Sequence, residues 1–239
     1  MTQVNLSNET QFILENFALI NSSIVFKKGN VIKTIANAEN ILAEYVCEEY
    51  FPQDFAIYDL SQFLAGIRIL DNPSLIFDND DYVTLKGRNA ALKYYFSDPQ
   101  ITLKVAPEKQ VKFPGSNIEF DIASDLQNKI SNISQKFKLE DMTFQSTVDG
   151  DDNHVSIILS DRENDTSNSC KFDMTSGKCT GNYELNMRVE NYRVIEGSYK
   201  VRVSEALLSE WVFTGPGDGR SKFLPKDLNL KYFIALEPK

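Results

Sequence analysis

The sequence has little of the chemistry on which most hydrolytic enzymes depend. It contains a single histidine, His154, in a predicted turn, and no serine or cysteine that the sequence would place beside it. Catalysis by a serine–histidine or cysteine–histidine pair is therefore unsupported, because such a nucleophile needs an adjacent base. A hydrolase with two carboxylates stays open, since such a pair meets only in the folded chain. We expect that the protein is not an enzyme.

The sequence is also poor in cysteine, with Cys47, Cys170 and Cys179 alone. An odd number suits a reducing compartment better than a disulfide framework. Cys170 and Cys179 could face each other across a turn at residues 175–177, but no second pair of metal ligands accompanies them. Residues 149–153 begin like a calcium loop and lack the glycine and the glutamate that complete one. We expect no metal and no cofactor.

Long apolar runs are absent as well. None approaches the ~20 residues that a membrane-spanning helix needs, and the first residues, MTQVNLSNET, lack the basic and apolar regions of a signal peptide. We therefore expect a cytoplasmic protein that does not contact a membrane. Hydrophobic residues still make up 42% of the chain, with 16 Phe and 10 Tyr. That is enough for a substantial core, in one large domain or in two of about 120 residues each.

Basic residues are outnumbered by acidic ones. The chain has 25 Lys and Arg against 34 Asp and Glu, which gives a formal net charge of −9. A protein that grips DNA by neutralising phosphates is usually basic on at least one face. The charge balance therefore argues against an ordinary DNA-binding protein.

The first half of the chain predicts two helices among strands. Residues 54–70 begin with a short apolar run typical of a strand. Asp59 then stands where its side chain can cap a helix whose apolar residues recur at helical spacing. Ser7 is expected to cap an earlier helix that continues to about Ile20. Strand-like runs joined by turn residues surround both helices.

The second half repeats this order of elements after a boundary. Residues 106–114 are flanked by prolines and have neither a helical nor an alternating period. A strand, a helix at Ser124–Phe137, several strands, a short helical stretch and further strands follow. We therefore expect two similar domains, residues 1–105 and residues 115–239, joined by a connector at 106–114.

The predicted helix at Ser124–Phe137 has two distinct faces. Lys129, Asn132 and Lys136 share one face, at spacings of three and four residues. By itself this pattern is typical of an ordinary solvated helix surface. The apolar residues predict a buried stripe on another face, made of Leu126, Ile130, Ile133 and Phe137.

Six short segments are more specific than their hydrophobic pattern. They are NFALIN at residues 16–21, FAIYDLSQFL at 55–64, VAPEKQVKFP at 105–114, DLQ at 125–127, GSYKV at 197–201 and YFIALE at 232–237. In this order they resemble segments of the sliding clamps of T-even-like tailed bacteriophages, the ring-shaped processivity factors of their DNA polymerases. Each segment is short, but six in one order across nearly the whole chain are much less expected by chance.

The resemblance implies an α+β DNA-clamp fold of two similar domains, each with two helices packed on antiparallel sheets. Three copies would form a homotrimeric ring that encircles duplex DNA without sequence preference and tethers the replicative DNA polymerase in the infected bacterial host. An ATP-driven clamp loader and late-transcription factors are the further partners that it implies. A ring is also compatible with the net negative charge. It would hold the DNA by encircling it, and tight electrostatic binding would slow its sliding. The alternative is a non-catalytic phage structural or interaction protein with two β-rich domains.

The resemblance also suggests which residues face the DNA. Lys129 and Lys136 lie on a helix that would line the hole, and Arg193 matches a basic position of the phage clamps. Arg68 is added because it lies outside the apolar stripe of its helix, although the resemblance gives it no counterpart. The first helix lacks the basic charge that phage clamps tend to place there.

A subunit interface is expected at the strand predicted for residues 91–96. Tyr94, Tyr95 and Phe96 are adjacent, so alternation cannot bury all three on one face. We expect at least one of them to contact a neighbouring subunit. Partners of phage clamps insert short hydrophobic tails near the connector, but the sequence does not reveal which residues would receive them. The glycine-rich residues 215–220 lack phosphate-loop spacing and are interpreted as an insertion relative to the family.

Overall fold

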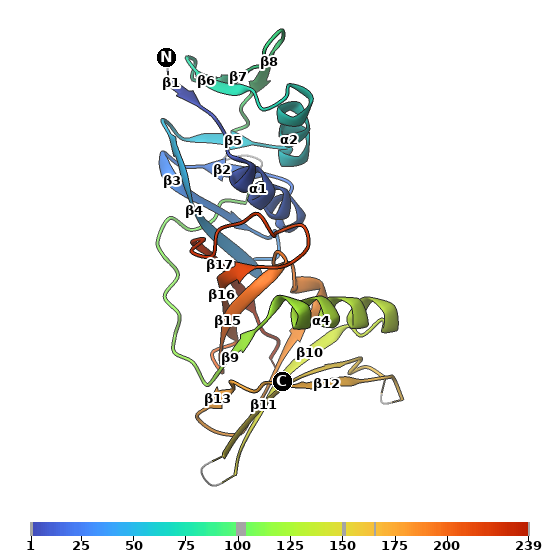
Figure 1. Ribbon diagram of the computed structural model, residues 1–239. Coiled ribbons are helices and arrows are strands. Elements are labelled where there is room, and N and C mark those ends of the chain that lie inside the picture. The colour runs from blue at the N-terminus through green and yellow to red at the C-terminus, as the bar shows by residue number, and fades with distance from the viewer. Residues whose placement is uncertain (1, 99–103, 150–151, 165, 239) are drawn as a thin grey trace. The chain divides into compact units, whose positions relative to one another are not determined.

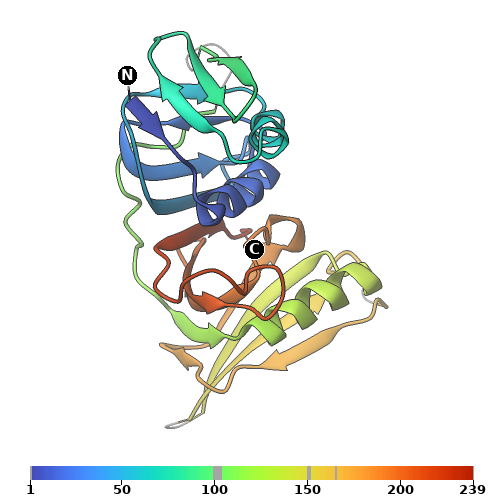
Figure 2. The same cartoon turned by 45° about the horizontal axis from the view of Figure 1, so that its top comes forward.

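The computed structural model describes residues 2–98, 104–149, 152–164 and 166–238 (Figure 1). The chain divides into two compact units, Met1–Glu108 and Lys109–Lys239. Each unit is built from antiparallel strands and from helices that pack on them (Figures 1 and 2). No helix among the described residues is long and apolar enough to cross a membrane.

Among its described residues the first unit contains eight strands and two helices. The strands are β1 (Thr2–Val4), β2 (Ile24–Phe26), β3 (Gly29–Ile35), β4 (Ile41–Phe51), β5 (Phe55–Ile57), β6 (Ser74–Phe77), β7 (Tyr82–Lys86) and β8 (Ala91–Tyr95). One antiparallel sheet has the order β1-β6-β7-β8, while β2 pairs with β5 and β3 with β4. The helices α1 (Asn8–Ile20) and α2 (Leu60–Ile69) lie side by side in this unit.

Both predicted helix caps of the first unit are confirmed. The Ser7 side chain accepts a hydrogen bond from the Thr10 backbone N–H over 3.1 Å. The Asp59 side chain accepts from the Gln62 backbone N–H over 2.8 Å. Each cap satisfies an amide of the first helical turn that has no partner within the helix. The two helices therefore begin where short-range sequence rules place them.

The second unit contains nine strands, one α-helix and one 3₁₀ turn among its described residues. They are β9 (Ile118–Ile122), α4 (Ser124–Phe137), β10 (Asp141–Asp149), β11 (Asp152–Ser160), β12 (Cys170–Asp173), β13 (Lys178–Cys179), β14 (Tyr183–Arg188), η1 (Val189–Asn191), β15 (Gly197–Ser204), β16 (Leu208–Pro216) and β17 (Leu230–Ala235). One sheet has the order β12-β11-β10-β14. Strands β13, β9, β15, β16 and β17 pair in succession.

The second unit differs from the two-helix expectation in one respect. Where a second helix was expected, the described residues form only the three-residue 3₁₀ turn η1. This segment is short and contains valine and asparagine, which favour a helix weakly. It leads directly to Tyr192, whose ring centroid lies 5.1 Å from that of the buried Trp211. The chain therefore leaves the helical conformation after η1, and Tyr192 packs against Trp211 at the position where a longer helix would continue.

Cys170 and Cys179 lie on strands that have different partners. Cys170 lies opposite Leu159 on β11, whereas Cys179 lies opposite Ile118 on β9. Both remain free thiols. The possibility that they face each other across a hairpin is not realised, because their strands pair with different neighbours.

Candidate nucleic-acid interface

The exposed face of α4 carries the two predicted lysines. Lys129, Asn132 and Lys136 are all exposed. The Lys129 Nζ lies 3.3 Å from Asp125 Oδ2, one helical turn earlier, and the two side chains are 64% and 70% exposed. A pair this open to water contributes little and exchanges easily with other partners. The face can therefore offer its positive charge to a polyanion.

The buried face of α4 agrees with the predicted stripe only at Ile130. The structure buries Gln127, Ile130 and Ser134, whereas the side chain of Phe137 is 55% exposed. Gln127 is buried because both ends of its amide are partnered. Its Nε2 donates to the Ile195 carbonyl over 2.9 Å, and its Oε1 accepts from the Gly197 N–H over 2.8 Å. The helix is therefore rotated from the orientation that hydrophobicity alone predicts.

Arg193 lies just beyond η1 and is exposed. Its Nε donates to the Glu190 carbonyl over 3.0 Å, which holds the side chain close to the turn. A groove of about 640 Å³ runs between the C-terminal half of α4 and η1. Its charged lining residues balance in sign, since it contains Lys138 and Arg188 together with Glu140 and Glu190.

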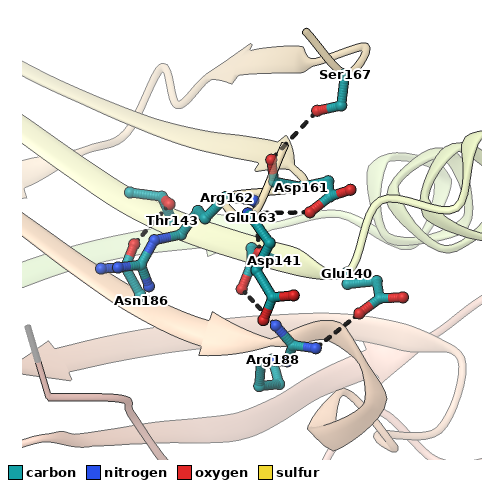
Figure 3. Close-up of polar contacts among 9 residues, drawn as sticks. All are labelled: Glu140, Asp141, Thr143, Asp161, Arg162, Glu163, Ser167, Asn186 and Arg188. Carbon is teal, nitrogen blue, oxygen red and sulfur yellow. Dashed lines mark hydrogen bonds and ion pairs between the residues drawn. The ribbon is translucent and has the colours of Figure 1, made fainter. Parts of the chain in front are cut away.

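A polar cluster lies where the chain enters β10 after α4. Figure 3 shows Arg188 between two consecutive acids: its guanidinium lies 2.7 Å from Glu140 Oε2 and 3.2 Å from Asp141 Oδ1. The other oxygen of Asp141 accepts from the Arg162 backbone N–H over 2.9 Å. Asp141 is only 2% exposed, so these contacts compensate for the burial of its charge. Burial opposes the charge of Arg188, yet the carboxylates of Asp141 and Glu140 raise its pKa.

Sequence reasoning missed this cluster, although the acidic pair Glu140–Asp141 shortly after the predicted helix is a visible signal. The partner, Arg188, arrives only at the end of β14. Nearby, the Thr143 hydroxyl donates to the Asn186 side-chain oxygen over 2.7 Å (Figure 3). The cluster is structural, because its members are paired with one another.

Arg68 lies on α2 in the first unit and forms an ion pair. Its Nη1 is 2.7 Å from Glu15 Oε1 on α1, and its side chain is 59% exposed. Helix α1 carries Glu9 and Glu15 and has no basic residue. The exposed charge of the first unit's helices is therefore acidic or balanced, in contrast to α4.

The three predicted interface aromatics point in different directions. Strand β8 is one of the two outer strands of the sheet β1-β6-β7-β8. Tyr94 turns inward, and its hydroxyl donates to the Asp59 carbonyl over 3.0 Å. Phe96 packs on Phe55 at a ring-centroid distance of 5.2 Å. Tyr95 remains 65% exposed.

The second unit also has an open sheet edge. Among the described residues β12 pairs only with β11, so its outer edge has no strand partner. The other outer strand of that sheet, β14, is partly covered, since the Glu237 N–H donates to the Asn186 carbonyl over 2.7 Å. An uncovered edge can add a strand from another chain.

The segment after the first unit's strands lines a cavity. Residues 104–117, all of them described, contain no helix or strand. The Lys33 Nζ donates to the Glu108 carbonyl over 3.2 Å, and the Lys27 Nζ lies 3.1 Å from Glu108 Oε1. Hydrogen bonds to Asp54 and Glu108 raise the pKa of Lys27. The adjoining cavity of about 380 Å³ is lined by Val25, Lys27, Val31, Lys33, Asp54, Val105, Ala106, Pro107 and Glu108.

Comparison with known proteins relates these features to one class. A family model described as DNA polymerase processivity factor matches residues 7–96. The sliding clamp of Vibrio phage KVP40 is 28% identical over 239 residues, which cover 98% of this chain and 99% of that relative. The sliding clamp of Enterobacteria phage T4 is 26% identical over 238 residues, with 98% and 97% covered.

Solved structures match the fold over the whole chain. A. fulgidus PCNA, solved with the C-terminal region of FEN-1 bound, gives a TM-score of 0.71 at 13% identity and covers 100% of this chain and 99% of its own. PCNA from Entamoeba histolytica gives 0.69 at 12% identity, with 99% and 98% covered. The predicted α+β DNA-clamp fold is confirmed.

Proposed function

We infer that this chain, a sliding clamp and DNA polymerase processivity factor related to those of T4-like bacteriophages, encircles duplex DNA as a homotrimeric ring and tethers the replicative polymerase. The observation that carries this inference is the likeness to two phage sliding clamps along almost the whole chain, together with the clamp fold. Sliding clamps are non-catalytic, so the protein is a processivity factor and not an enzyme. The same likeness favours this function over that of a virion structural protein.

The proposed ring forms by head-to-tail pairing of open sheet edges. We propose that β8 of one subunit pairs with β12 of the next, so that each subunit uses a different edge on each side. A contact of this kind generates a closed ring when its rotation closes. Tyr95 at the end of β8 and Phe137 on α4, 65% and 55% exposed, supply apolar surface that a neighbour would cover. Tyr94 and Phe96 would support the edge from within.

We assign residues 1–105 and 115–239 to the two clamp domains and residues 106–114 to the connector. The division between compact units, between Glu108 and Lys109, supports this assignment. The cavity of about 380 Å³ beside Pro107 and Glu108 is the site that we propose for short hydrophobic tails of partner proteins. Its apolar residues and its position at the connector support that use. The polymerase, the ATP-driven clamp loader and late-transcription factors would bind there in turn.

The DNA-facing residues that we propose are Lys129, Lys136 and Arg193, with Arg68 contributing least because Glu15 already pairs with it. Contacts to phosphate would be few and mediated by water. This suits a clamp, because each strong phosphate contact adds salt-dependent affinity that sliding would have to break. The net charge of −9 agrees with weak contact inside a ring. The site of action is the cytoplasm of the infected bacterial host.

The test is a primer-extension assay with the polymerase and the clamp loader of the same phage. On a primed circular template the protein should lengthen the polymerase run, and on a linear template with free ends the gain should be lost as rings slide off. Sedimentation equilibrium should give a trimer. A monomer at high protein concentration, or run lengths unchanged by the protein and loader, would overturn the proposal.

A further inference from the structure

The glycine-rich loop after β16 is an ordered turn built around one carboxylate. Glu196 Oε1 accepts from the Gly219 N–H over 3.0 Å, and Glu196 Oε2 accepts from the Arg220 N–H over 3.0 Å. The turn is closed by a hydrogen bond of 2.9 Å from the Gly217 N–H to the Ser221 hydroxyl, which is fully buried. Successive backbone N–H groups that converge on an anion fix a turn firmly.

Two glycines are required by this arrangement. A Cβ on Gly217 would lie 2.6 Å from Glu196 Oε1, and a Cβ on Gly219 would lie 2.5 Å from Glu196 Oε2. Any other residue at either position would push the carboxylate away. The two glycines therefore leave room for the turn to approach the Glu196 carboxylate closely. Residues 217–222 adopt a defined conformation that depends on this contact.

The same carboxylate connects the turn to α4. Asn128 Nδ2 donates to Glu196 Oε1 over 3.3 Å, and the preceding helix residue, Gln127, holds the Gly197 N–H over 2.8 Å. Two consecutive residues of α4 thus hold two consecutive residues at the start of β15. The turn therefore lies beside α4 in the second unit (Figures 1 and 2).

The turn brings cations to the flank of the lysine-bearing helix. Asn128 directly precedes Lys129, so the turn contacts α4 about 100° around the helix axis from that lysine. Arg220 and Lys222 are exposed, and Asp218 is the one acid between Gly217 and Lys222. Asp218 and Glu196 match the two cations in number, but the Glu196 carboxylate accepts from two backbone N–H groups of the turn, whereas the two cationic side chains are exposed. The position of the turn extends the exposed face of α4.

We propose that Glu196 is a positioning residue that holds the turn at residues 217–222 beside α4, so that Lys222 and Arg220 extend the surface facing the phosphates of duplex DNA. This inference rests on the proposed clamp function. Glu196 itself repels phosphate, and its contribution acts through the backbone that it holds. The sign of its effect on binding is therefore opposite to the sign that its charge alone predicts.

The test measures binding of a short fluorescein-labelled DNA duplex to the intact clamp across a range of salt concentrations. Lys222→Gln should lower the slope of log K against log salt by about 0.9, the value for one phosphate contact. Glu196→Ala should also weaken binding and lower the slope, although it removes a negative charge. Glu196→Gln, which keeps one acceptor oxygen, should fall between the wild type and Glu196→Ala.

Lys200→Gln is the matched control. Lys200 is exposed on β15 between Tyr199 and Val201, whose buried side chains point to the opposite face of the strand. This variant should bind as the wild type does. The double variant Glu196→Ala/Lys222→Gln should match Glu196→Ala closely, because removing Glu196 already displaces Lys222 and residues that act as a unit are not additive.

Hydrogen exchange shows whether Glu196→Ala loosens only the turn. Exchange should accelerate at the Gly219 and Arg220 amides, with α4 unchanged. Tighter DNA binding by Glu196→Ala, or a wild-type salt slope in Lys222→Gln, would overturn the proposal. If the wild type lengthens polymerase runs while both variants bind as Lys200→Gln does, only the turn proposal fails. If the wild type gives no gain in run length, the clamp function fails first.

Discussion

The helices of the two units are built for different purposes. In the first unit, α1 and α2 each bury five residues, pack on each other and begin at a side-chain cap. In the second unit, α4 buries three residues, two of them polar, and its N-cap is Ala123, which has no side chain that could cap it. Helices α1 and α2 therefore contribute apolar side chains to the core of their unit, whereas α4 exposes a charged face to water. The helices of the two units therefore differ in how much they contribute to the core and in how much polar surface they expose.

The largest difference should appear between two phenylalanines on these helices. Phe17 of α1 is 0% exposed and Phe137 of α4 is 55% exposed. Phe17→Ala should lower the free energy of unfolding by about 3–5 kcal/mol, the usual cost of emptying a packed aromatic site. Phe137→Ala should change it by less than about 0.5 kcal/mol. Urea denaturation of the two variants measures both values.

The same pair of variants sharpens the ring proposal. If a neighbouring subunit covers Phe137, its truncation should weaken the trimer, and a loss of about 1.4 kcal/mol corresponds to a tenfold change in the dissociation constant. Sedimentation at several concentrations measures this. A Phe137→Ala trimer as stable as the wild type would remove Phe137 from the interface.

The second prediction concerns the start of α1, where Glu49 adds to the cap. Its Oε1 accepts from the Ser7 N–H over 2.6 Å and its Oε2 from the Thr10 hydroxyl over 2.7 Å. Partial burial acts to raise the pKa of Glu49, but these hydrogen bonds outweigh it and the pKa is lowered. Glu49→Gln should cost about 1–2 kcal/mol, the range for a helix cap. The neighbouring exposed Glu48→Gln is the control and should cost less than about 0.5 kcal/mol.

The pH dependence follows from the direction of that shift. A carboxylate whose pKa is lower in the folded state binds protons more readily when the chain unfolds. Its contribution is therefore complete above the unfolded pKa of about 4.3 and is lost as the pH falls through the lower, folded value. The stability difference between wild type and Glu49→Gln should shrink across this acidic window. A difference that stays constant as the pH falls would show that Glu49 acts through packing alone.

What the sequence predicted and what it missed follow the same division. Ser7 and Asp59 were predictable as caps because a cap and its helix lie within four residues. The burial of Gln127 was not, because its partners at Ile195 and Gly197 lie some 70 positions away in the chain. Hydrophobic periodicity therefore gave the existence and bounds of α4 but the wrong rotation about its axis.

The glycine-rich loop teaches the same lesson. Its sequence excluded a phosphate loop, yet nothing local indicated that Glu196 would fill the turn. The sequence also predicted a strand at residues 91–96. It did not show which aromatic of Tyr94, Tyr95 and Phe96 stays exposed. That depends on Asp59 and Phe55, which the fold brings to β8 from earlier in the chain.

A third and smaller effect is expected where α4 lacks a cap. Ala123 has φ −82° and ψ 155°, the extended conformation that an N-cap residue adopts, and it is exposed. Ala123→Ser should place a hydroxyl where it can accept from a first-turn amide. The gain should be about 0.5–1 kcal/mol in the free energy of unfolding. Ser7→Ala on α1 is the mirror experiment and should lose a similar amount, so equal and opposite shifts would confirm that capping is what separates the two helices.

The smallest change in stability, with the clearest functional effect, is expected from reversing the charge of α4. Lys129→Glu/Lys136→Glu should alter the free energy of unfolding by less than about 0.5 kcal/mol, because both side chains are exposed. Run length with polymerase and loader should nevertheless fall. The loss should be greatest at raised salt, where the remaining attraction to phosphate is already screened. Arg68→Glu is the comparison from the first unit. It replaces a residue that Glu15 pairs with and should reduce run length less. If the α4 double variant supports normal run lengths at every salt concentration while Arg68→Glu does not, the DNA-facing charge lies in the first unit and the proposed roles of the two units are reversed.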